Sequence, residues 1–139
     1  MVHALRRAGQ RLRSGGSLIS IRPHRTLLPS VSVLTPSRRL PVARLTTPGF
    51  DGRQAAAEAA LARVVEEGGF TLAGVRNGRF RARLDNLSQV RAYLELIAPP
   101  RPRFPPGGRA TLIQLWRSQP RGSTIEIAES IVVTALRRR

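Results

Sequence analysis

Five prolines stand within ten residues at positions 99–108 (PPRPRFPPGG). Proline fixes one backbone dihedral and lacks the N–H group that helices and sheets use, so this segment can be neither a helix nor a central strand. We expect a stiff, extended loop there. A chain of 139 residues is long enough for one domain and too short for two. The regular elements of that domain must therefore lie before and after the proline-rich segment.

Two strands are predicted near the start of the chain. Residues 17–24 alternate in hydrophobicity, and residues 26–34 are short and rich in β-branched side chains, as is typical of strands. Pro29 favours an edge or a bulge for the second strand. Residues 35–41 have the composition of a turn, and residues 42–50 are compatible with an extended segment or a loop.

Two helices are predicted in the middle of the chain. Residues 52–67 are rich in strong helix formers, and Asp51 is suited to cap their N-terminus. Residues 87–98 carry apolar side chains at helical spacing, and Asp85 or Asn86 is the expected cap.

The remaining segments predict strands. Residues 78–84 (GRFRARL) alternate, so one face of this strand is apolar and the other is cationic. Residues 110–116 (ATLIQLW) predict a strand, residues 117–123 a turn, and residues 124–136 a strand pair or one long strand. The order β-β-α-β-α-β-β predicts an α+β fold with two helices on one face of a mixed sheet.

The charge of the chain indicates the class of its partner. Twenty-four arginines and no lysine stand against eight acidic residues, for a formal net charge of +16. A GC-rich genome would account for the absence of lysine, but it does not remove acidic residues. Arginine binds phosphate through a planar, bidentate donor fork. We therefore expect a polyanionic partner, and RNA is the most common one.

The N-terminal region is rich in arginine and contains no acid before Asp51. Residues 1–16 are typical of an organellar targeting segment, and they are equally compatible with a basic tail that stays attached and grips RNA. We expect them to extend from a domain at residues 17–139. The corresponding location is a mitochondrial or other organellar matrix, or the cytoplasm if the protein is bacterial.

Composition excludes several kinds of site. The absence of cysteine excludes disulfides, thiol catalysis and cysteine-ligated metals. His3 and His24 are the only histidines, and both lie in the basic N-terminal region. We therefore expect no metal and no cofactor. No apolar run reaches the roughly 18 to 20 residues that cross a bilayer, so we expect no membrane span. Phe104 and Trp116 could stack on bases, although such residues more often belong to a core or a subunit contact.

Four segments, in this order, resemble the RidA (YjgF) family of reactive-intermediate deaminases over about residues 17–136. Residues 64–75 (VVEEGGFTLAGV) resemble the family's passage that follows its helix, and residues 81–90 (RARLDNLSQV) resemble its strand, acidic turn and second helix. Residues 107–116 (GGRATLIQLW) resemble its P-A-R-[ST] strand, and residues 124–130 (TIEIAES) resemble its closing strand. The resemblance implies a RidA/chorismate-mutase-like sheet and a homotrimer with a site at each subunit interface.

The resemblance also implies two catalytic residues. Arg109 matches the arginine that binds the substrate carboxylate, and Glu126 matches the glutamate that positions water for attack on a C=N carbon. Two family features are missing. The only tyrosine is Tyr93, whereas the family carries one on its first strand, and Val31 stands where the family has a glycine.

Two functions are compatible with these observations. In the first, the protein is a non-catalytic, RNA-bound subunit of a large ribonucleoprotein, such as an organellar ribosome, where it contacts rRNA and neighbouring proteins. In the second, it is a trimeric 2-iminobutanoate or enamine deaminase that uses Arg109 and Glu126. The charge favours the first. The arginines expected to bind RNA are Arg6, Arg7, Arg11, Arg13, Arg79, Arg81, Arg83, Arg137, Arg138 and Arg139.

Overall fold

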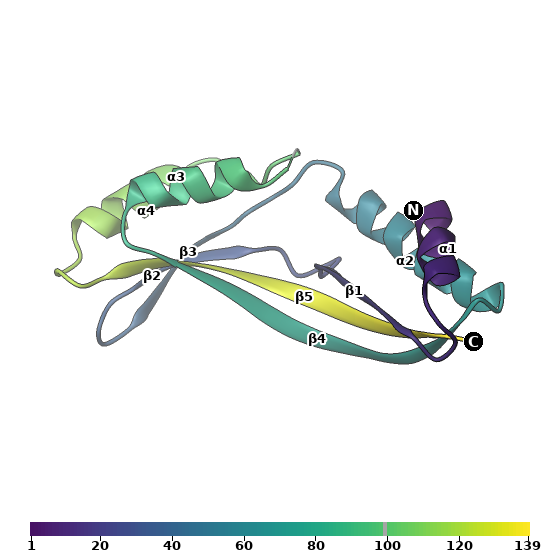
Figure 1. Cartoon of the computed structure of the whole chain (residues 1–139). Coiled ribbons are helices and arrows are strands. Elements are labelled where there is room, and N and C mark those ends of the chain that lie inside the picture. The colour runs from purple at the N-terminus through teal and green to yellow at the C-terminus, as the bar shows by residue number, and fades with distance from the viewer. Residues whose placement is uncertain (99) are drawn as a thin grey trace. The chain divides into compact units, whose positions relative to one another are not determined.

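A computed structural model describes residues 1–98 and 100–139 of the chain. In this part the chain is an α+β protein with four helices and a five-stranded, mostly antiparallel open sheet (Figure 1). The helices are α1 (Val2–Arg11), α2 (Phe50–Glu66), α3 (Leu87–Leu96) and α4 (Gly108–Arg117). The strands are β1 (Ser17–Pro23), β2 (Ser30–Leu34), β3 (Arg39–Arg44), β4 (Phe70–Leu84) and β5 (Thr124–Arg138).

The strand β5 organises the sheet. Its C-terminal part pairs with β1 in antiparallel register, with Ser17 opposite Arg137. Its N-terminal part pairs with β2, also antiparallel, with Leu34 opposite Thr124. The strand β3 extends the sheet from β2, and β4 pairs with β5.

The chain divides into two compact units. Unit 1 comprises Met1–Thr26, Gly49–Gly78 and Ile131–Arg139, and unit 2 comprises Leu27–Pro48 and Arg79–Ser130. Unit 1 therefore contains α1, α2 and β1, and unit 2 contains β2, β3, α3 and α4. The long strands β4 and β5 each contribute one part to either unit.

The core of unit 1 joins its helices to its strands. The buried residues of this core are Leu61, Val64, Phe70 and Leu136, and Val2, Leu5 and Leu12 from the region of α1 pack against them. Gly9 allows the close approach of α1, because a Cβ at this position would lie 3.1 Å from the Phe70 ring. The arginine-rich residues Val2–Arg11 are thus a packed helix of unit 1.

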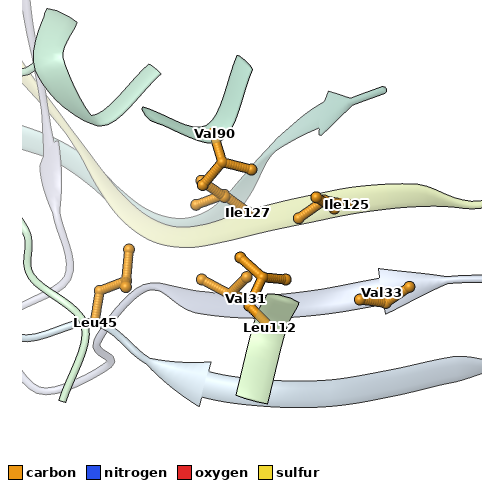
Figure 2. Close-up of a cluster of buried hydrophobic side chains, with 7 residues drawn as sticks. All are labelled: Val31, Val33, Leu45, Val90, Leu112, Ile125 and Ile127. Atoms are coloured by element: carbon orange, nitrogen blue, oxygen red, sulfur yellow. The ribbon is translucent and has the colours of Figure 1, made fainter. Parts of the chain in front are cut away.

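The core of unit 2 lies between two helices and two strands. Val31 and Val33 of β2 and Ile125 and Ile127 of β5 meet Val90 of α3 and Leu112 of α4, as Figure 2 shows, and Leu45 completes the cluster. All seven side chains are buried. Burying a side chain of this size contributes about 1.5–3 kcal/mol to stability.

The strand that we predict at residues 110–116 is wrong, because these residues belong to helix α4. Leu112, Leu115 and Trp116 follow the i, i+3, i+4 spacing of a helix, and all three pack in the core of unit 2. Gly107 precedes the helix with a φ of 75°, a backbone conformation that favours glycine. A short apolar run has no periodicity that separates a buried strand from a buried helix, and here the packing against β2 and β3 decides.

Most predictions for the other strands are confirmed. The strands β1 and β2 lie within the two predicted segments, and β2 begins just after Pro29. Residues 39–44 form β3, so the predicted turn at 35–41 is too long. The segment at 124–136 is one long strand, β5, and β4 begins at Phe70, well before the predicted start at residue 78.

The predicted helices α2 and α3 are also confirmed, with one change of cap. Asn86 caps α3, and its side chain accepts a hydrogen bond from the Gln89 N–H. The N-cap of α2 is Gly49 and not Asp51, which instead lies in the first turn. The described residues contain four helices where two were expected, because α1 and α4 were not predicted.

Residues 100–107 of the proline-rich segment form a loop, as expected, whereas Gly108, which we included in the loop, begins helix α4. Residues 100–107 contain neither a helix nor a named strand, and Arg103 forms an isolated β-bridge with Thr46. Pro99 lies outside the described residues.

The helical packing of residues 108–117 has a measurable consequence. We expect Leu112→Ala to lower the free energy of unfolding by about 2–5 kcal/mol, because it leaves a cavity in the core of unit 2. Urea unfolding followed by circular dichroism measures this loss. The matched control is Leu96→Ala, since Leu96 is 85% exposed at the end of α3. Equal effects of the two substitutions would contradict the packing described here.

Candidate nucleic-acid interface

Carboxylates hold several of the arginines within the fold. Glu67 pairs with Arg6 of α1 and, at 3.1 Å, with Arg63 one turn earlier on α2. Glu95 pairs with Arg91 within α3 at 2.8 Å. The Arg6 guanidinium lowers the pKa of Glu67 mainly by donating hydrogen bonds to it. This ion pair connects α1 to α2, so Arg6, which we expected to bind RNA, has a partner inside the protein.

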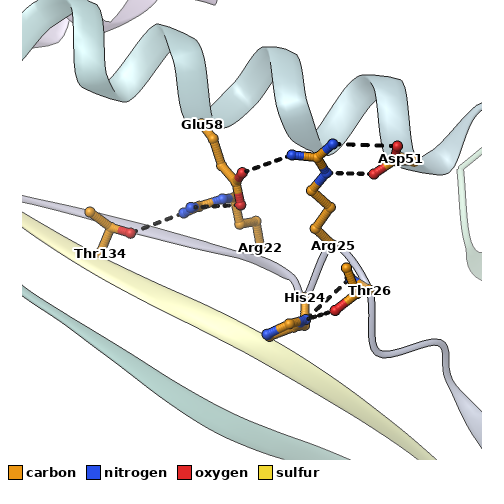
Figure 3. A network of polar contacts seen from close by, with 7 residues as sticks. All are labelled: Arg22, His24, Arg25, Thr26, Asp51, Glu58 and Thr134. Atoms are coloured by element: carbon orange, nitrogen blue, oxygen red, sulfur yellow. Dashed lines mark hydrogen bonds and ion pairs between the residues drawn. The ribbon is translucent and has the colours of Figure 1, made fainter.

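A second group of ion pairs joins β1 to α2 in unit 1 (Figure 3). Arg22 lies 3.5 Å from Glu58 and donates a hydrogen bond of 3.0 Å to the Thr134 hydroxyl on β5. Arg25 pairs with Asp51 and also contacts Glu58 at 3.9 Å. The hydrogen bond from Arg25 lowers the pKa of Asp51. These contacts fasten the end of β1 to α2.

The arginines of the second half of β4 have a different environment. Arg79, Arg81 and Arg83 are exposed, and none of them forms an ion pair with a described residue. They alternate with Phe80, Ala82 and Leu84, and Leu84 packs against the core of unit 2. Alternate side chains of a strand lie about 6.5–7 Å apart on one face. This part of β4 therefore presents a row of three evenly spaced guanidinium groups.

The segment that follows α1 pairs with the C-terminal end of β5 in unit 1. The Gly15 N–H donates to the Arg138 carbonyl at 3.0 Å, and the Arg138 N–H donates to the Gly16 carbonyl at 2.8 Å. This pairing brings the region of Arg13 beside the terminal arginines. Further arginines of this part of unit 1 without an ion pair to a described residue are Arg7, Arg11, Arg137 and Arg139.

Glu126 is fully buried on β5, and its partner is Arg39 of β3. The Arg39 Nη1 atom lies 2.5 Å from Glu126 Oε1. The other carboxylate oxygen, Oε2, is buried without a hydrogen bond from any described residue. Sequence reasoning missed Arg39, because we assigned it to a turn. The pairing of Arg39 with Glu126 follows only from the strand pairing, because β3 and β5 are both neighbours of β2 in the sheet.

Arg109 and Glu126 do not line a common cavity. Arg109 lies in the first turn of α4 and lines a cavity between α3 and α4, and Glu126 is not among the residues around it. The Arg109 side chain is exposed, and the fully buried carboxylate of Glu126 is paired with Arg39.

Glu129 is a further titratable group of unit 2. Burial raises the pKa of this carboxyl on β5. Burial of the Tyr93 side chain on α3 raises the pKa of its hydroxyl, and the charge of Glu129 raises it further. Raised values of this kind occur at functional sites and in ordinary cores alike.

No protein-family model, curated protein or solved structure matches this chain. Among the residues that the structure describes, no three histidine, cysteine or acidic side chains are grouped so as to hold a metal ion. None of the described helices has the length and apolar character that crossing a membrane requires.

The Arg39–Glu126 pair is expected to matter for stability. Arg39→Ala leaves the buried carboxylate of Glu126 without its partner, which costs at most about 3–5 kcal/mol of unfolding free energy, because the Arg39 side chain is itself 43% exposed. Adding Glu126→Gln to this variant removes the buried charge and should restore part of the loss. Urea unfolding of the single and double variants measures both effects. Arg38→Ala, at the exposed neighbouring position, is the control, and an equally small loss for both single variants would refute a structural role for the pair.

Proposed function

We propose that this protein binds RNA as a non-catalytic, structural component of a larger ribonucleoprotein, such as an organellar ribosome. The exposed row of Arg79, Arg81 and Arg83 on β4, without carboxylate partners in the described chain, is the observation that carries this proposal. A row of like charges at a spacing of about 6.5–7 Å is unfavourable for the isolated protein and favourable against a phosphate backbone.

The distribution of the acids supports this proposal. Asp51, Glu58, Glu67, Glu95 and Glu126 are engaged in ion pairs that join elements or lie within a helix. They neutralise arginines that hold the fold together and leave the β4 row uncompensated. Rows of this kind bind phosphates without reading base sequence.

A second contact is proposed for unit 1. The unpaired arginines near α1 and at the chain terminus lie on segments joined by backbone hydrogen bonds, so one polyanion segment can contact both groups. Arginine suits this role because its planar fork binds phosphate oxygens in pairs.

The deaminase alternative has less support. The segment that carries Arg109 in the RidA resemblance is a helix and not a strand, and Glu126 is already paired with Arg39. The RidA/chorismate-mutase-like fold and the homotrimer are proposals that depend on that resemblance.

The first test measures RNA affinity against salt. Binding of a short single-stranded RNA to the full chain should weaken steeply as salt rises, because bound counterions are released. The variant R79Q/R81Q/R83Q should bind the RNA more weakly. It should also reduce the slope of log affinity against log salt concentration by about 2, since each lost single-strand phosphate contact reduces this slope by about 0.7. The control R38Q/R117Q/R121Q removes the same charge from exposed positions of unit 2. Identical slopes for the two variants would sink the proposed role of β4.

The second test concerns the native assembly. In a gentle cell or organelle lysate, the protein should sediment with a particle far larger than its 15.3 kDa chain. Ribonuclease should shift it to lighter fractions. A ribonuclease-resistant peak near three chains would instead support a free trimer, and hydrolysis of 2-iminobutanoate should then be measured.

A further inference from the structure

Unit 2 contains a cavity of about 600 Å³ between α3, α4 and the proline-rich segment that joins them. Its apolar wall is formed by Leu87, Val90 and Leu94 of α3 and by Leu112 and Ile113 of α4. Val90 and Leu112 also belong to the buried core, so the cavity stands on the packed part of the unit. The volume lies within the range of about 300–1,000 Å³ found for small-molecule sites.

Three arginines from three different segments line the same cavity. Arg101 donates hydrogen bonds of 3.2 Å from Nε to the Glu95 and Ile97 carbonyls, which holds its guanidinium beside the end of α3. Arg91 is held by the Glu95 carboxylate. Arg109 has no ion pair or side-chain hydrogen bond with any described residue. Two of the three guanidinium groups are thus positioned by the protein, and the third is available to a ligand.

The charge around the cavity indicates the kind of anion. Three arginines and Glu95 give a formal sum of +2. A phosphate monoester carries about −1.5 to −2 charges at neutral pH and matches this sum. A single carboxylate would leave a positive charge without a partner. Guanidinium groups also bind phosphate oxygens in bidentate geometry.

The size and the apolar wall indicate the rest of the ligand. Inorganic phosphate alone would leave most of the cavity unfilled. Phe104 of the proline-rich segment also lines the cavity and packs against the core of unit 2, and bases stack on such rings. We propose that this cavity binds an aromatic phosphate monoester of the nucleotide class, with its phosphate on the arginines and its base against Phe104.

This proposal does not rest on the RNA-binding role of β4, because Arg79, Arg81 and Arg83 do not line the cavity. The same chemistry has two sources, a free mononucleotide or one nucleotide of an RNA strand. The experiment below separates them.

The test titrates AMP into the full-length protein. Calorimetry measures binding, and fluorescence reports it locally, because the sole tryptophan, Trp116, lies one turn after Ile113 on α4. We expect saturable binding that Arg109→Gln weakens about tenfold through loss of a charge-assisted hydrogen bond. Arg117→Gln is the matched control, since Arg117 lies on α4 and does not line the cavity. No binding at millimolar AMP, or equal affinities of the two variants, overturns the proposal.

Two fragments of the ligand test its two halves. Adenosine and ribose 5-phosphate should each bind more weakly than AMP. Phe104→Leu should weaken the binding of AMP and leave the binding of ribose 5-phosphate unchanged. If the binding of both ligands weakened equally, the stacking role of Phe104 would be overturned. Arg109 is exposed, so its replacement decides the matter even if the Phe104 variant fails to fold.

The triple variant R79Q/R81Q/R83Q separates this site from the RNA interface. It should bind AMP with the affinity of the unchanged protein, and a tenfold loss would overturn the independence of the cavity. A saturating RNA oligonucleotide identifies the source of the ligand. If the RNA displaces AMP, the natural ligand of the cavity is a nucleotide within an RNA strand. If AMP binding is unchanged, the natural ligand is a free nucleotide.

Discussion

Both units depend on the backbone pairing of one strand, β5. Its C-terminal part pairs with β1, its N-terminal part pairs with β2, and β4 also pairs with it. This pairing satisfies the polar backbone groups of a segment that is largely buried. It also places Ile125 and Ile127 in the core of unit 2 and Leu136 in the core of unit 1. The helices of each unit therefore pack on apolar side chains that β5 supplies.

The scarcity of acids determines which arginines are structural. Glu67 connects α1 to α2, Glu58 connects α2 to β1, and Glu126 connects β5 to β3. The last pair differs from the others because Glu126 is fully buried, and the desolvation of a buried charge makes its partner indispensable. Exposed pairs contribute less than about 1 kcal/mol each. These three carboxylates thus lie at junctions between elements, and none of the ion pairs among the described residues involves the arginines in the second half of β4.

The two proposed sites use arginine in different ways. On β4 the guanidinium groups stand in an exposed row, which suits an extended polyanion and carries little selectivity. In the cavity of unit 2 they surround an apolar hollow, where shape and burial add selectivity for a small ligand. Arg101 and Phe104 come from the loop between α3 and α4 and line the cavity together with side chains of both helices.

The sequence by itself determined the elements whose signals are local. Helical periodicity and a capping residue define α3, strong helix formers define α2, and alternation defines the arginine row of β4. It also determined the excess of positive charge and the absence of regular structure at 100–107. The tertiary structure alone decided that residues 108–117 are a helix, because their apolar side chains suit either period until β2 and β3 provide a surface. It alone paired Arg39 with Glu126 and gathered Arg91, Arg101 and Arg109 around one cavity. Arg39 and Glu126 are 87 residues apart in the chain, and the three cavity arginines come from α3, α4 and the loop between them, so no local periodicity encodes either arrangement.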